Sequence, residues 1–383
     1  MADEQCVVID NGSSSLKIGL SGSYSPLFIV PSVVANARTK YKDKFSDEYY
    51  FLDDFESNLE YMSLTHLIDH GHITDFDKLE LLWQHCFNKL ELHSDCRPVL
   101  LTEAPFSSSS DRVKTSEIFF EKFNVDDLNI SVSGLLSMYG LGKLTGTIVE
   151  IGDGVTQVIP VIEGYSERAS INRVDFGGLE LTMYLQKLLC TRGYYLTSRS
   201  DFQLVRKLKE KLCFCSLDPH SDEDRLDLEE VYTLPDGTVL RDGETTEIDL
   251  SLERFYVCEA LFNPNIVDSD APGIVKTVWK SILSSAMTSR TTLTDNIFVS
   301  GGTTLFPNFE KRLQMELQDI APPGGRNKVK VTAHPDRHTM AWRGGSILSE
   351  PKLKDISSNM WISRSEWDEN GQEIVLRKFG LDN

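Results

Sequence analysis

The sequence predicts an α/β protein built from two related halves, and three observations support this prediction. Segments typical of buried strands alternate with amphipathic helical segments along the 383 residues. A strand–turn–strand segment in residues 5–20 recurs about 140 residues later, in residues 146–161. The turns of both segments consist of small residues. Such a repeat indicates a duplication around a shared cleft.

The composition restricts the class of function. The chain has 39 basic and 58 acidic residues, a net charge of −19, which argues against nonspecific binding of nucleic acid or anionic membrane. No apolar run approaches the roughly 18 residues of a membrane-spanning helix. The segment MADEQCVVID lacks the pattern of a signal peptide, and the seven cysteines are scattered. We therefore expect an intracellular protein whose cysteines are buried thiols.

The first half begins with the strand–turn–strand segment CVVIDNGSSSLKIGL. Residues 38–60 are charged and aperiodic, which predicts a surface excursion. The periodicity from Leu79 to Leu90 in FDKLELLWQHCFNKL predicts a helix. PVLLTEAPF is expected to form a buried strand, and SSDRVKTSEIFFEKF a helix capped by Ser110 or Asp111.

The second half repeats the design with GTIVEIGDGVTQVIPV. A helix ended by Gly193 is predicted for FGGLELTMYLQKLLCTRGY. A second helix, which includes Cys213 and Cys215, is predicted for SDFQLVRKLKEKLCFCSL. NIFVSGGTTLFPNF predicts a strand that opens into a glycine turn. The histidines of residues 66–72 and 334–338 lack metal-ligand spacing, since Pro335 interrupts the second group.

The two small-residue turns have the composition of phosphate-binding loops. In DNGSSSLK, backbone N–H groups and hydroxyls can surround an oxyanion, and Lys17 adds a positive charge; Gly12, Ser13, Ser14 and Ser15 form the turn. GDGVT can do the same from the opposite side. Asp10 and Asp153 would then hold a hydrated Mg²⁺ through water. For either loop alone, an unrelated hairpin turn is the alternative.

Other phosphate-binding motifs are absent from the sequence. There is no GxxxxGK[ST] stretch, and no GxGxxG opens a helix after a strand. A nucleotide would therefore bind through the two turns.

Eight ordered motifs resemble actin. They are VVIDNGSSSLKIG, LLTEAPF, GDGVTQVIPVIEGY, VRKLKEKLCF, YTLPDG, VSGGTTLFPNF, WRGGSIL and MWISRSEWDENGQEIVLRKFG. The resemblance covers essentially the whole chain and is closer to a divergent actin-related protein than to conventional actin. It implies the actin-like fold shared with sugar kinases and chaperone ATPases, with ATP and Mg²⁺ between two domains. The outer domain would comprise residues 1–140 plus 340–383, and the inner domain residues 141–339.

The resemblance also implies site residues by position. Asp10 and Asp153 would belong to the metal environment. One phosphate side would consist of Ser13, Ser14, Ser15, Leu16 and Lys17, and the other of Gly152, Asp153, Gly154 and Val155. The adenosine side would consist of Gly178, Arg206, Lys209, Glu210, Gly301, Gly302, Thr303, Leu305 and Phe306. For Lys209 and Glu210, a solvated helix face is the alternative.

Three residues around the expected attacking water differ from the family pattern. Ser133 stands where actin has glutamine, Glu150 where it has aspartate, and Gln157 where it has histidine. Serine is too short to replace the glutamine amide, the longer glutamate displaces its carboxylate, and Gln157 cannot carry a proton. We expect ATP binding with weak or absent hydrolysis. The alternative is that the substitutions compensate one another and slow hydrolysis persists.

The surfaces that join actin subunits also differ. Residues 38–50 are charged where an apolar finger is usual, Asp268 and Asp270 lie in the plug-like loop, and Glu167 and Arg168 lie on the receiving surface. Desolvating unpaired charges opposes tight packing, which argues against an actin-like homofilament.

The groove expected to receive partners, near Tyr139, Gly142 and Ile347, is also altered, by Arg343 and by a longer following segment. We therefore expect a non-polymerising or poorly polymerising subunit or scaffold of an actin-related or actin-containing protein complex. The expected compartment is the cytoplasm and its cytoskeleton. The alternatives are a slow ATPase that opens and closes its cleft, and a subunit of a nuclear chromatin-remodelling complex. A phosphotransferase is disfavoured because no catalytic aspartate lies beside a sugar pocket.

Overall fold

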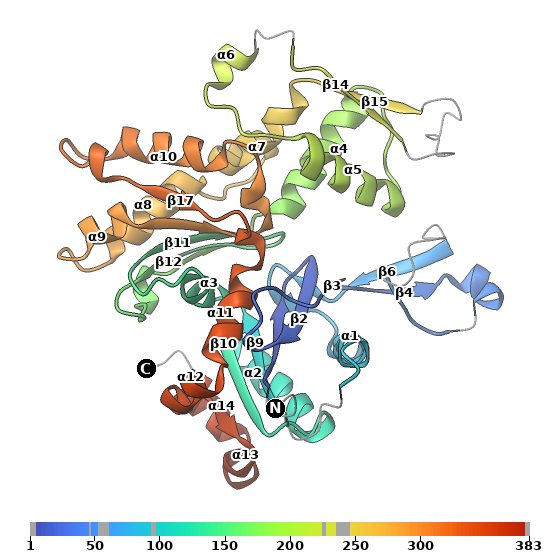
Figure 1. The fold of residues 1–383 in the computed structure, drawn as a ribbon. Helices are drawn as coiled ribbons and strands as arrows, with labels where there is room; N and C mark the ends of the chain where they lie inside the picture. Colours follow the sequence, from blue (N-terminus) through green and yellow to red (C-terminus); the bar gives the residue numbers. More distant parts are fainter. Residues whose placement is uncertain are drawn as a thin grey trace.

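The computed structural model describes residues 5–45, 47–52, 61–92, 97–223, 227–234 and 246–379. Two sheets organise these residues (Figure 1). The first has the order β18-β10-β9-β1-β2-β3, and the second the order β13-β12-β11-β16-β17. The strands of the first sheet are β1 (Val7–Asn11), β2 (Ser15–Leu20), β3 (Phe28–Pro31), β9 (Pro98–Glu103), β10 (Asp127–Val132) and β18 (Ile362–Ser363). Those of the second are β11 (Gly146–Ile151), β12 (Thr156–Val161), β13 (Asn172–Val174), β16 (Ile297–Ser300) and β17 (Val331–Ala333).

The two sheets share one topology. In each, three antiparallel strands are followed by two parallel ones: β3-β2-β1 then β9 and β10, and β13-β12-β11 then β16 and β17. The parallel strands are reached through helices, as parallel pairing requires. This topology fits the duplication that the repeated turns indicated.

Helices cover both sheets, and each sheet has its own apolar core. One core draws on residues between Val7 and Ile130 together with residues 362–379, and the other on residues between Val149 and Val331. The helices around the first core are α1 (Phe76–Lys89), α2 (Ser109–Glu117), α13 (Arg364–Asn370) and α14 (Gln372–Phe379). Those around the second are α4 (Gly178–Thr191), α5 (Arg199–Leu212), α7 (Glu253–Phe262), α8 (Ile274–Ser284), α9 (Arg290–Asp295) and α10 (Phe309–Ile320). The exact domain boundaries stay a prediction.

Two helices lie between the sheets (Figure 1). Helix α3 (Ser133–Gly140) contacts β11 and β12, while α11 (Met340–Leu348) contacts β1 and β9. They approach each other so closely that a Cβ on Gly344 would lie 1.7 Å from the carbonyl oxygen of Leu136. Glycine is therefore required where these helices meet.

The remaining elements are short and peripheral. They are β4 (Val33–Ala37), β5 (Tyr50–Phe51), β6 (Met62–His66), β7 (Ile68–Asp69), β8 (His72–Ile73), β14 (Glu230–Thr233), β15 (Glu247–Leu250), α6 (Pro219–Glu223) and α12 (Pro351–Ile356). Among the described residues, no helix has both the length and the apolar character needed to cross a membrane.

Two local expectations need correction. Helix α2 is capped by Ser108, whose hydroxyl accepts the N–H of Asp111, because the helix begins earlier than the polar run suggested. Helix α5 ends at Leu212, so Cys213 and Cys215 lie beyond the helix, where both are buried free thiols. The segment of residues 38–60, expected at the surface, contains the 3₁₀ turn η1 (Thr39–Lys44), which has no buried residue; residues 46 and 53–60 lie outside the described part.

Other local expectations are confirmed. Helix α4 ends before Gly193, which has a φ of 96°. All the described cysteines except Cys190 are buried.

Candidate functional site

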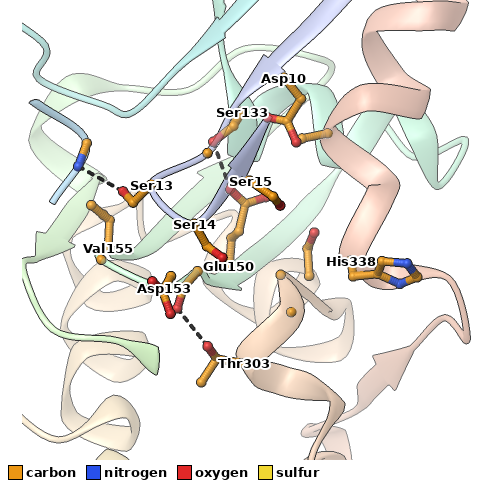
Figure 2. Close-up of a pocket in the computed structure, with 18 of the residues that line it drawn as sticks. Asp10, Ser13, Ser14, Ser15, Ser133, Glu150, Asp153, Val155, Thr303 and His338 are labelled. Atoms are coloured by element: carbon orange, nitrogen blue, oxygen red, sulfur yellow. Dashed lines mark hydrogen bonds between the residues drawn. The ribbon is translucent and has the colours of Figure 1, made fainter. Parts of the chain in front are cut away.

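A cavity of about 380 Å³ opens between the two sheets. Both small-residue turns, the expected water site and the expected adenosine side contribute to its wall (Figure 2). The predicted residues that line it are Asp10, Gly12, Ser13, Ser14, Ser15, Lys17, Ser133, Glu150, Gly152, Asp153, Gly154, Val155, Gln157, Arg206, Lys209, Glu210, Gly301, Gly302, Thr303, Leu305 and Phe306. Leu16 and Gly178 lie behind the wall: the Leu16 side chain is fully buried in the first core, and Gly178 begins α4.

The first turn connects β1 to β2 and is fixed by its own backbone. A Cβ on Gly12 would lie 2.6 Å from the carbonyl oxygen of Ser15, so the turn needs glycine there. The hydroxyl of Ser32 donates to the carbonyl oxygen of Gly12 at 2.6 Å. Ser13, Ser14 and Ser15 then face the cavity (Figure 2).

The β1–β2 register explains why the charges at this turn are neighbours. Asp10 pairs with Lys17 across the hairpin, and Lys17 Nζ lies 2.7 Å from Asp10 Oδ2. The hydroxyl of Thr102, at the end of the adjacent β9, donates to Asp10 Oδ1 at 2.7 Å. Both oxygens of this buried carboxylate therefore already have partners, and its charge is compensated by Lys17.

The second turn is held by the start of α4. The N–H of Gly178 donates to the carbonyl oxygen of Gly152 at 3.0 Å, and that of Leu179 to Asp153 at 2.8 Å. The hydroxyl of Thr303 donates to the same Gly152 carbonyl at 2.7 Å (Figure 2). Gly178 therefore contacts the second turn on the side away from the cavity. This position explains why Gly178 does not line the cavity.

Two cations of α5 reach this region. The guanidinium of Arg206 donates to the hydroxyl of Ser14 and lies 3.2 Å from Asp153 Oδ1, so it links the two turns. Lys209 is only 3% exposed and donates to the carbonyl oxygen of Gly178 and the hydroxyl of Thr182, at 2.5 and 2.7 Å. Burial lowers the pKa of Lys209, with Arg206 adding to the effect against the opposing charge of Asp153. The alternative of a solvated helix face is wrong for Lys209.

The three residues of the expected water site form one hydrogen-bonded cluster. Glu150 and Gln157 are opposite residues of the β11–β12 hairpin, and Gln157 Nε2 donates to Glu150 Oε1 at 2.6 Å. Ser133, the first residue of α3, donates its hydroxyl to the same oxygen at 2.7 Å (Figure 2). Gln157 Nε2 also lies 2.7 Å from Ser133 Oγ.

Two serines that the sequence interpretation missed complete this cluster. Ser137 donates to Glu150 Oε2 at 2.6 Å and lies 3.1 Å from the hydroxyl of Ser300. Ser137 follows Ser133 by one helical turn, a spacing that places both on the same face. The four-residue spacing of Ser133 and Ser137 in the sequence is therefore the pattern that could have identified Ser137 as a residue of this cluster.

Burial controls the electrostatics of the cluster. It raises the pKa of Glu150, and the charge of Asp10 adds to this, while hydrogen bonds from Ser137, Ser133 and Gln157 oppose it. In the described part of the chain, Gln157 Oε1 is buried without a hydrogen-bond partner. The cluster therefore satisfies both oxygens of Glu150 and leaves one amide oxygen unsatisfied.

The cavity wall includes the two carboxylates predicted to lie near a metal, Asp10 and Asp153, but it forms no complete cage within the described part of the chain. Among the described residues, no group of three or more His, Cys, Asp or Glu side chains is placed to hold a metal ion. Asp10 and Asp153 both line the cavity, and each is already paired with a cation of the chain. They fit a hydrated Mg²⁺ held mainly by phosphate oxygens and water.

His338 is a further lining residue that the sequence interpretation did not select (Figure 2). It lies on the 3₁₀ turn η8 (Arg337–Thr339), and the HPDRH stretch had been considered only as a metal motif. Burial lowers the pKa of His338, and the charges of Lys17 and Arg337 lower it further against the opposing charge of Asp336.

The comparison with known families agrees with this architecture. A family model described as actin matches residues 1–380. The match spans both sheets, both turns and the two helices between the sheets. The α/β arrangement with a cavity between two sheets of the same topology is consistent with an actin-like fold. The chain belongs to the actin family.

Proposed function

We propose that this actin-family chain binds ATP with Mg²⁺ in the cavity, hydrolyses it weakly or not at all, and acts as a poorly polymerising scaffold subunit of a larger cytoskeletal complex in the cytoplasm. Such a chain would be a divergent actin-related protein. The observation that carries the proposal is the closed hydrogen-bonded cluster around Glu150, at the position expected to hold the attacking water.

The cavity supports nucleotide binding in three ways. Its volume of about 380 Å³ lies within the usual range for ligand sites. The two turns present small residues and hydroxyls suited to phosphate oxygens, and Lys17 and Arg206 supply positive charge between them. Leu305 and Phe306 supply apolar surface on the adenosine side. A bound Mg²⁺ would neutralise part of the phosphate charge beside Asp10 and Asp153.

The Glu150 cluster supports weak hydrolysis because it uses up the groups that could activate a water. Ser133 and Ser137 direct their hydroxyl protons to Glu150, and Gln157 directs its amide to the same carboxylate. A neutral or fully hydrogen-bonded carboxyl is a poor proton acceptor. With glutamine in place of histidine, the hairpin offers no second titratable group at Gln157.

One observation favours slow hydrolysis as the second candidate. Within the Glu150 cluster, Gln157 Oε1 is buried and has no hydrogen-bond partner in the described part of the chain. A water molecule that entered the cavity at this point would donate a hydrogen bond to Gln157 Oε1. Positioning of that kind, without a base, gives turnover that is slow but above zero.

The surface charges support poor self-assembly. The side chain of Asp268 is 89% exposed, and Lys187 approaches it only to 3.6 Å. Arg168 is exposed and lies over the ring of Phe106, on the expected receiving surface. Phe45 packs against the apolar cluster of β4 and β6 instead of forming an exposed finger. Burying such charges in a subunit interface costs free energy.

The test is the nucleotide content of freshly purified protein, released by denaturation and separated by chromatography. Stoichiometric ATP that persists during incubation with Mg²⁺ supports the scaffold. ATP that converts to ADP supports the slow ATPase, and protein free of nucleotide would overturn nucleotide binding. Sedimentation at polymerising salt, with conventional actin as the reference, tests self-assembly, and a pellet of filaments would refute that part.

A further inference from the structure

The small sheet β5-β4-β6 projects from the body of the molecule (Figure 1). It has its own apolar cluster, formed by Val33, Ala35, Leu52, Met62 and Leu64. Strand β4 ends at Ala37 and is followed by the 3₁₀ turn η1. We call residues 38–45, RTKYKDKF, the basic turn. No residue of η1 is buried, so this turn is accessible to a partner.

The basic turn has a charge opposite to that of the rest of the chain. It contains four basic residues and one acidic residue, a net charge of +3, whereas the whole chain has a net charge of −19, which leaves −22 for the other residues. The four basic side chains are exposed, and among the described residues they form no ion pair: Arg38, Lys40, Lys42 and Lys44. Within that part of the chain, their charges are available to an anionic ligand.

Two tyrosine rings hold ammonium groups of the basic turn in place. Lys44 Nζ lies 5.4 Å from the ring centroid of Tyr41 and 5.1 Å from that of Tyr61. Lys40 Nζ lies 5.6 Å from the centroid of Tyr41. The two rings pack edge to face, with their centroids 4.8 Å apart. A cation held over a ring keeps its other side free for an anion, so less conformational entropy is lost when a carboxylate binds.

The backbone of the basic turn is fixed to β6 and to the apolar cluster. The N–H of Arg38 donates to the carbonyl oxygen of Tyr61 at 2.9 Å, and Arg38 Nε donates to that of Met62 at 3.0 Å. At the other end, the N–H of Phe45 donates to the carbonyl oxygen of Lys42 at 3.2 Å, and the Phe45 ring packs against the apolar cluster. The cations are therefore presented from a backbone that is anchored at both ends.

The dimensions of η1 indicate the size of the anion. A 3₁₀ turn rises about 2 Å per residue, so the six residues of η1 span about 12 Å. An extended peptide rises about 3.3 Å per residue, so about four of its residues match this length. A 3₁₀ turn has three residues per revolution, and the two-residue spacing of the basic side chains therefore distributes them around it. A segment that lies along one side would reach about two of them.

The charge of the rest of the chain disfavours larger polyanions. A nucleic acid duplex or an anionic membrane extends beyond the turn, where a molecule of net charge −22 repels it. A short segment with Asp or Glu side chains places its charge only at the turn. Carboxylates also form charge-assisted hydrogen bonds with lysine and arginine. The chemistry of the site therefore fits a short acidic peptide segment.

We propose that the basic turn is a docking site for a short acidic segment of a protein partner, about four residues long and composed mainly of Asp and Glu. The inference rests on the proposed scaffold role and is independent of nucleotide in the cavity. Exposed ion pairs are screened by salt, so the docking is weak and salt-dependent, and it adds to other contacts of the partner.

The first measurement is the binding of a probe peptide, Glu-Glu-Asp-Glu, to the full chain. The peptide carries a rhodamine of zero net charge, and binding is followed by fluorescence anisotropy at about 30 mM ionic strength, where screening is weak. The amide peptide Gln-Gln-Asn-Gln should not bind. A triple variant removes the lysine charges of the turn: Lys40→Gln, Lys42→Gln, Lys44→Gln. We expect its dissociation constant for the probe to rise about fivefold, the effect of losing two exposed ion pairs.

The matched control removes the same charge from exposed positions of α8 and α10: Lys276→Gln, Lys280→Gln, Lys311→Gln. It should bind the probe like wild type. Equal dissociation constants for the two triple variants would overturn the docking site, because the interaction would then reflect net charge alone.

Two comparisons identify the occupant of the turn. Residues 53–60, DDFESNLE, contain four acidic residues and lie outside the described part of the chain. If the probe binds only after these four are replaced by amides, the chain's own segment occupies the turn, and the proposal is wrong. A DNA duplex or an anionic vesicle that binds more tightly than the probe, and only through the lysines of the turn, would equally refute a protein partner.

Carbodiimide coupling, which joins lysine amines to carboxylates as amides, locates the contact by mass spectrometry. We expect the probe on Lys40, Lys42 or Lys44, and coupling only at other lysines would contradict the proposal. Filaments at polymerising salt, with probe binding at the turn intact, would instead count against the proposed scaffold role alone.

Discussion

Gln157 Nε2 donates to Glu150 Oε1 at 2.6 Å across the β11–β12 hairpin. The hairpin register places these two side chains opposite each other, and Ser133 reaches the same carboxylate oxygen from α3. The three residues of the expected water site therefore contact one another. They form one structural unit, so their substitution should be tested together.

Introducing at all three positions the residues that the resemblance to actin implies is expected to increase ATP hydrolysis. The triple variant Ser133→Gln, Glu150→Asp, Gln157→His returns an amide of full reach, a shorter carboxylate and a titratable ring. We expect a rate of phosphate release about 100-fold higher, at the lower end of the roughly 10²–10⁴-fold contribution of one general acid–base group. Each single variant should gain less, because it leaves an incomplete cluster. An equal rate in the triple variant and wild type would contradict the water-site argument.

Removing the charge of Lys17 is expected to weaken nucleotide binding. Lys17→Met deletes the cation beside the first turn and leaves Asp10 without its ion-pair partner. We expect an increase in the ATP dissociation constant of about 10- to 100-fold, from the loss of one charged hydrogen bond. The exposed Lys207→Met on α5 is the control and should bind like wild type. Titration calorimetry measures the ATP dissociation constants of the two variants. An unchanged dissociation constant for Lys17→Met would show that Lys17 does not contribute to nucleotide binding.

The raised pKa of Glu150 predicts a pH dependence of stability. The native state holds this proton more tightly than the unfolded chain, so Glu150 contributes stability that is complete below its unfolded value of 4.5 and is lost as the pH rises through the native pKa. Glu150→Gln keeps the shape and cannot ionise. We expect the melting temperature of wild type to fall more steeply between pH 5 and 8 than that of Glu150→Gln. Parallel profiles would show that the carboxyl is ionised throughout.

A methyl group at Gly344 is expected to destabilise the contact between α3 and α11. Its Cβ would lie 1.7 Å from the carbonyl oxygen of Leu136, so one helix must move. We expect Gly344→Ala to lower the free energy of unfolding by about 3 kcal/mol or more, at the upper end for overpacking. Gly302→Ala is the control, since no atom lies within 4 Å of a Cβ there. Urea unfolding followed by circular dichroism compares them.

The sequence was sufficient to predict the hairpins, their turns and the family, but not the side-chain contacts of the cavity. The alternation of apolar and polar residues identified both hairpins, and the small residues of their turns marked where phosphate would bind. The order of motifs identified the actin family, which the match over residues 1–380 confirms. These features are local in sequence, because hairpin register and turn chemistry depend on adjacent residues.

Only the tertiary structure decided which side chains meet across long sequence separations. Lys209 is buried because α4 covers it, although its helical position alone resembles a solvated face. The partners of Glu150 come from α3 and from the opposite strand, and Ser300, beside Ser137, comes from the next strand of the sheet. His70 and Glu180 are separated by 110 residues and meet only because two sheets are folded against each other. Sequence patterns record local geometry, whereas burial and pairing of charges depend on how distant elements pack, and that packing sets the pKa values and contacts of this cavity.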